Sequence, residues 1–198
     1  MNRNQLLLMT AILEGGLLLA GGIGCWLMDI PLLEEMSLSG GAVLWSLVAT
    51  LPMLSVLVIT EVIPWKGFEE INNLLEHKLL PIFRKLNWFD LLLVSLAAGI
   101  GEEVFFRGFL QALLAEWVPS WAAIAIASLC FGLAHPITKW YFVIVTIIGV
   151  YLGILFWRTE NLVIPILVHA VYDWIVLSYL VYRPAKEKGE SEEAPSEE

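Results

Sequence analysis

The chain has 198 residues, of which 59% are hydrophobic and 16% charged, and its mean hydropathy is +0.77. These values exclude an ordinary soluble domain, and the absence of a basic stretch excludes nucleic acid as a partner. The net charge of −9 reflects glutamates gathered at the C-terminal end. We therefore expect a membrane domain over residues 1–182 and a disordered, acidic cytoplasmic tail over residues 183–198.

Six apolar segments follow one another, most of them long enough for a helix to cross about 30 Å of hydrocarbon. They cover residues 5–28, 41–63, 88–115, 120–134, 140–157 and 161–182. The fourth segment is short and is expected to continue past His135. The pattern predicts an all-α, polytopic membrane protein with about six transmembrane helices.

The positions of lysine and arginine predict the orientation in the membrane. With the N-terminus inside, nine of the 11 basic residues lie on the cytoplasmic side, Arg158 lies on the other side and Arg107 lies within a span. Cytoplasmic loops carry such an excess of basic residues. Both termini are therefore predicted to be cytoplasmic, and the plasma membrane is the expected location.

An amphipathic stretch separates the second and third segments. Its apolar residues recur at helical spacing, at Phe68, Ile71, Leu74, Leu75 and Leu79. The pattern predicts a helix that lies in the cytoplasmic interface and ends at Pro81. Two interpretations stay open: a structured connector, or a surface that guides a membrane-anchored substrate.

The third segment contains the most unusual residues of the chain. Glu102, Glu103 and Arg107 lie within an apolar run, where each ionisable side chain costs at least about 2.5 kcal/mol, so they indicate a functional site. Glu103 and Arg107 are four residues apart, share a helix face and can form an ion pair, whereas Glu102 points about 100° away. We expect Glu103 to be structural and Glu102 to be free for general-base chemistry.

Two further segments carry histidines. The fourth ends in Phe-Gly-Leu-Ala-His at His135, and the sixth contains His-Ala-Val-Tyr-Asp, which places His169 and Asp173 on one helix face. At about 1.5 Å per residue, Glu102 and His169 are expected at a similar depth, in a pocket that opens inward. A single membrane histidine can serve packing alone, and Glu14 in the first segment is interpreted as such a structural polar residue. Polar residues on three spans together favour a functional site over a role in packing alone.

These motifs carry a family resemblance. Glu-Glu-Val-Phe-Phe-Arg, Phe-Gly-Leu-Ala-His and His-Ala-Val-Tyr-Asp resemble the three motifs of the CPBP intramembrane proteases. That group includes the type II CAAX prenyl endopeptidases and bacteriocin-processing or self-immunity proteins. The resemblance covers about residues 90–182, and it implies an all-helical membrane fold that hydrolyses peptide bonds near the membrane.

The resemblance also implies roles for individual residues. Glu102 would be the base that activates water, His135 would help to hold that water, and His169 would face the developing oxyanion. The expected supporting residues are Glu103, Arg107 and Phe131.

Asp173 departs from the His-x-x-x-Asn pattern of the CAAX proteases, because an ionised Asp cannot donate to an oxyanion. Three alternatives stay open: Asp173 is protonated and stabilises the oxyanion with His169, it orients His169, or it ligates a metal. Glu102, His135, His169 and Asp173 could together hold zinc or another divalent metal. The absence of an HExxH pair favours a glutamate mechanism that requires no cofactor.

The leading functional prediction is an intramembrane endopeptidase. Its expected partners are the lipid bilayer and a membrane-associated peptide or protein, prenylated or not. A non-catalytic membrane binding or immunity protein is the alternative from another class. A proton-coupled transporter is a weaker alternative, since buried Glu and His side chains also build proton relays.

Overall fold

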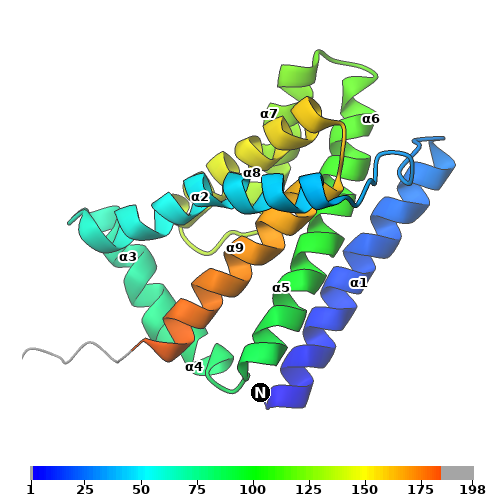
Figure 1. Cartoon of the computed structure of the whole chain (residues 1–198). Coiled ribbons are helices and arrows are strands. Elements are labelled where there is room, and N and C mark those ends of the chain that lie inside the picture. The colour runs from blue at the N-terminus through cyan, green and yellow to red at the C-terminus, as the bar shows by residue number, and fades with distance from the viewer. Residues whose placement is uncertain (1, 184–198) are drawn as a thin grey trace, which may run out of the picture.

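The computed structural model describes residues 2–183, which fold into helices without any strand in this range (Figure 1). The predicted all-α fold is thereby confirmed. Of the predicted disordered tail, residues 184–198 lie outside the described residues.

The elements follow the predicted apolar segments closely, except that the helix of the fourth segment ends at Leu133 and does not continue past His135 as expected. They are α1 (Arg3–Leu27), α2 (Gly40–Val62), α3 (Lys66–Leu74), the π-helix η1 (Leu75–Leu79), α4 (Leu80–Phe83), α5 (Trp88–Glu103), the π-helix η2 (Val104–Gln111), α6 (Ala112–Ala115), α7 (Ser120–Leu133), α8 (Lys139–Thr159) and α9 (Val163–Tyr182). The predicted third segment is thus three consecutive elements, α5, η2 and α6.

Within residues 2–183, four helices, α1, α2, α8 and α9, are long and apolar enough to cross a membrane. The helix α7 has 14 residues, and the third segment is divided among three elements. A count of six spans is therefore not established by helix length alone. Large apolar side chains such as Ile12, Leu19, Leu44 and Leu51 are exposed on α1 and α2, as a surface that faces lipid requires.

The helix α5 lies between α1 and α9, and these three helices form the layer that holds the site (Figure 1). An ion pair fixes the start of α1 on the start of α5, because Arg3 Nη2 lies 2.5 Å from Oδ1 of the fully buried Asp90. The helix α2 crosses α9, and α7 packs on α8 and η2. The starts of α1 and α5 and the end of α9 lie toward the same end of the molecule (Figure 1).

The amphipathic stretch is helical over α3, η1 and α4. Ile71 and Leu80 are buried, whereas Glu69 and Lys78 are exposed. The predicted end at Pro81 is wrong, since the helix continues to Phe83. Pro81 is the second residue of α4, directly after the π-helix η1, and because it lacks an N–H it leaves one carbonyl of the preceding turn without a helical partner.

Candidate active site

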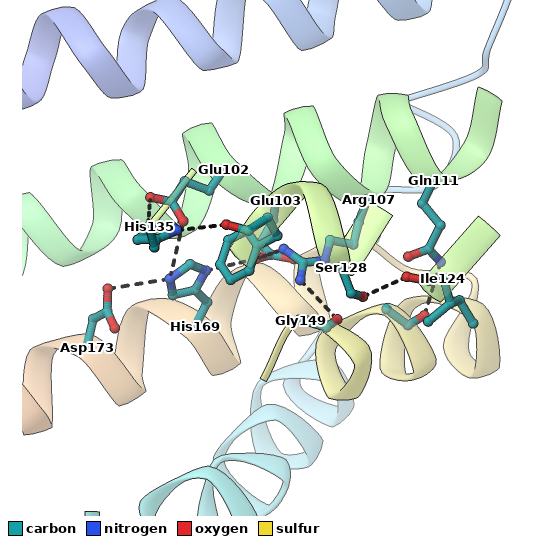
Figure 2. Close-up of polar contacts among 12 residues, drawn as sticks. Glu102, Glu103, Arg107, Gln111, Ile124, Ser128, His135, Gly149, His169 and Asp173 are labelled. Atoms are coloured by element: carbon teal, nitrogen blue, oxygen red, sulfur yellow. Dashed lines mark hydrogen bonds and ion pairs between the residues drawn. The ribbon is translucent and has the colours of Figure 1, made fainter. Parts of the chain in front are cut away.

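The structure brings all the predicted site residues together in one place (Figure 2). Glu102 and Glu103 are the last residues of α5, and His135 follows α7. His169 and Asp173 lie on α9, one turn apart.

Glu102 faces both histidines of the predicted site. His135 Nε2 lies 3.6 Å from Glu102 Oε1, and His169 Nε2 lies 3.9 Å from Glu102 Oε2. Glu102 is only 8% exposed, and its Oε2 has no hydrogen-bond partner among the described residues. Because both separations exceed direct hydrogen-bond length, a water molecule between these groups can bridge them.

The two imidazoles are oriented in the same manner. His135 Nδ1 lies 2.9 Å from the carbonyl oxygen of Phe131, and His169 Nδ1 lies 2.8 Å from Glu103 Oε1. A carbonyl or a carboxylate can only accept, so each Nδ1 carries the hydrogen that it donates. Each ring therefore turns its Nε2 toward Glu102, and that nitrogen is left for chemistry.

Glu103 connects this arrangement to a fully buried arginine. Arg107 Nη1 donates to Glu103 Oε1 at 2.7 Å, which is the pairing that the four-residue spacing predicts. Arg107 Nη2 donates to the carbonyl oxygen of Gly149 on α8 at 3.0 Å. A buried charge of this kind is tolerated only when it is paired and hydrogen-bonded. Glu103 thus holds both Arg107 and His169 through one oxygen.

Phe131 packs in the middle of the cluster. The guanidinium carbon of Arg107 lies 4.4 Å from the centre of its ring, within cation–π range. The ring also contacts His135 and His169, with centroid separations of 5.0 and 6.0 Å. Its contacts with both imidazoles restrict their rotation.

Asp173 lies at the open side of the cluster. Its Oδ2 is 3.4 Å from His169 Nε2, the same ring nitrogen that faces Glu102. Its side chain is 30% exposed, whereas that of Glu103 is fully buried. In residues 2–183, no three His, Cys, Asp or Glu side chains are arranged to hold a metal ion.

A cavity of about 410 Å³ adjoins the site. Glu102, His135 and His169 line one part of it, and Arg183, at the end of α9, lines another. The 14 positions from His169 to Arg183 on α9 correspond to about 20 Å. Most of the remaining lining is aliphatic, and it includes the apolar face of α3, η1 and α4. The amphipathic stretch therefore forms a wall of the cavity, which the sequence pattern did not reveal.

The part of the cavity lined by Arg183 carries a small ionic cluster. Arg183 Nη2 donates to Glu76 Oε1 on η1 at 2.7 Å, and Arg183 Nη1 donates to Glu61 on α2. These two contacts join the ends of α9, α2 and η1.

Residues 84–175 match the family of Rce1-like type II CAAX prenyl endopeptidases. The match covers a little under half of the chain. The chain is also 28% identical over 120 residues to Uncharacterized protein YpbD of Bacillus subtilis (strain 168). That match covers 59% of this chain and 59% of the relative. No solved structure matches the chain.

The Rce1-like segment contains all of the predicted catalytic and supporting residues, whereas α1 and α2 lie outside it. The resemblance expected from the three motifs is thereby confirmed.

Two features of the candidate site were not predicted. The first is η2, a π-helix that begins directly after Glu103; π-segments are frequent at functional sites. The second is a pair of glycines on α8. Gln111 Nε2 donates to the carbonyl oxygen of Gly153 at 3.1 Å, one turn beyond the contact between Arg107 and Gly149. The Gly-x-x-x-Gly spacing in the fifth segment was the signal for this close helix contact.

Proposed function

We propose that the protein is an intramembrane endopeptidase that hydrolyses a peptide bond of a membrane-associated substrate. The observation that supports this most is the convergence of the Glu102 carboxylate with Nε2 of His135 and of His169 beside an apolar cavity. The Rce1-like match of residues 84–175 points to the same class of reaction.

Glu102 activates the water in this proposal. A water molecule between Glu102 Oε1 and His135 Nε2 gives one proton to the carboxylate as its oxygen attacks the substrate carbonyl carbon. His135 holds the water in line, because the hydrogen bond from its Nδ1 to the Phe131 carbonyl fixes the ring. Glu102 is only 8% exposed, and this burial strengthens the interaction between the carboxylate and its proton donor.

His169 stabilises the tetrahedral intermediate. Its Nδ1–H is held by Glu103, so a proton on Nε2 is directed at the oxyanion that forms from the carbonyl oxygen. The carbon–nitrogen bond then breaks, and the proton that Glu102 took from water passes to the departing amine. Asp173, 3.4 Å from the same Nε2, orients the ring and favours its protonated form in this scheme.

The cavity defines the substrate class that we propose. Its aliphatic lining fits an apolar peptide segment or a hydrocarbon chain attached to a peptide, and its polar groups lie near the site and near Arg183. The description of the matched family, type II CAAX prenyl endopeptidase, names a prenylated substrate. A prenylated peptide and an unmodified single-span peptide are therefore the two probes to compare.

The decisive experiment measures cleavage of both probes by purified protein in liposomes, with mass spectrometry of the products. Hydrolysis in water labelled with heavy oxygen places the label in the new C-terminal carboxylate. A binding protein or a transporter would give no labelled product. We expect Glu102→Gln to lower kcat by about 10³-fold or more, because Gln cannot accept the proton. Equal activity of Glu102→Gln and wild type would refute Glu102 as the base.

Matched controls separate catalysis from a general loss of polarity. Glu34→Gln, at an exposed loop carboxylate, is the control for Glu102→Gln. His77→Gln, at an exposed histidine, is the control for His135→Gln. Both controls should keep wild-type kcat. Treatment with a chelator should leave cleavage unchanged for a glutamate mechanism; loss of activity that zinc restores would instead favour a metal held by the same residues.

A further inference from the structure

The helix α1 lies outside the Rce1-like segment, yet it packs along α5, the helix that carries Glu102, and along η2. Arg3 pairs with Asp90 at one end, and Cys25 Sγ lies 3.5 Å from the carbonyl oxygen of Gly108 at the other. The two helices run in the same direction (Figure 1). The position of every α1 residue relative to Glu102 is therefore fixed.

Glu14 lies beside the site in this arrangement. A Cβ added at Gly101 would lie 2.5 Å from the backbone oxygen of Glu14 and 3.1 Å from its Cα, so the two backbones are in contact one residue before Glu102. The Glu14 carboxyl interacts electrostatically with Glu102 on α5, with His135 after α7, and with His169 and Asp173 on α9.

Three carboxyl groups of the site, those of Glu14, Glu102 and Glu103, have a buried oxygen that makes no hydrogen bond within residues 2–183. Two neighbouring carboxyls in a buried site do not both ionise at low cost. The negative charge is more stable on Glu102, because the proposed scheme places a proton on His169 Nε2, which faces its carboxylate at 3.9 Å.

We propose that Glu14 is a positioning residue for Glu102: the two form a buried carboxyl pair in which Glu14 holds a proton and leaves the negative charge on Glu102. The base of the proposed reaction is thereby kept in its active form by a helix outside the family motifs. Glu14 does not line the described cavity, so it acts on Glu102 and not on the substrate.

The first test needs no substrate. Infrared spectra of the full chain in liposomes at neutral pH should contain a band of a protonated carboxyl group that disappears in Glu14→Gln. The band should remain in Glu34→Gln, which makes the same change at an exposed carboxyl. Its absence from the wild type, or its persistence in Glu14→Gln, would overturn the proposal.

The second test rests on the proposed function and uses the two liposome probes. Glu14→Gln resembles the protonated acid and should keep kcat within about twofold, whereas Glu14→Leu should lower kcat about tenfold with KM unchanged. An unchanged kcat in Glu14→Leu overturns the positioning role. If the wild type cleaves neither probe, the proposed function fails, and the infrared result still decides the protonation of Glu14.

Discussion

Replacement of Arg107 by methionine is the most direct test of the network behind the site. Methionine has similar volume and no charge, so the change leaves the fully buried Glu103 carboxyl without its arginine partner and with only the His169 ring beside it. It also removes the donor from the Gly149 carbonyl. Breaking one side of a buried ion pair costs about 3–5 kcal/mol, and the unpaired carbonyl adds about 1 kcal/mol.

The same reasoning makes the double variant informative. Arg107→Met with Glu103→Gln removes both charges, and the Gln side-chain oxygen can still accept from His169 Nδ1. We expect the double variant to recover about 2 kcal/mol or more of the free energy of unfolding lost in Arg107→Met alone. Arg84→Met, at an exposed arginine, is the control and should change the free energy of unfolding by about 0.5 kcal/mol or less.

The measurement is reversible unfolding in mixed micelles with increasing denaturing detergent, followed by the fluorescence of the chain's 9 tryptophans. The reasoning is refuted if Arg107→Met is as stable as the control. It is also refuted if the double variant is no more stable than Arg107→Met, since the cost would then not arise from an unpaired Glu103.

Two further predictions concern other parts of the fold. Gly101→Ala should lower the free energy of unfolding by about 1–3 kcal/mol, because the new methyl group would meet the Glu14 backbone, whereas Gly15→Ala, with no atom within 4 Å of its added Cβ, should be neutral or stabilising. Both are measured by the same detergent titration. In the loop after α1, burial raises the pKa of Glu35, and the charge of Glu160 raises it further. The folded state therefore binds this proton more tightly than the unfolded state, and stability falls as pH rises from about 4.3 through the folded pKa. Glu35→Gln should raise the midpoint of thermal unfolding relative to wild type near pH 8 and leave it unchanged near pH 4; a constant difference at both pH values would contradict this cause.

The sequence by itself determined the helices and the same-helix relations of the site. Apolar runs predicted every long helix to within a few residues, because burial in lipid depends on composition over about 20 positions. The four-residue spacing predicted the contact between Glu103 and Arg107, since the helical repeat alone sets which side chains share a face. The three motifs predicted which residues would meet in one place.

Only the tertiary structure decided the contacts between helices. Glu103 binds His169 from another helix, Arg107 reaches the carbonyl of Gly149, and the Glu14 backbone packs against Gly101. Periodicity leaves the rotation and crossing of each helix undetermined, and the π-helix η2 changes the direction of the side chains that follow Glu103. These quantities are set by packing of small residues such as Gly101 and Gly149 against neighbouring helices, which fixes how closely two backbones approach.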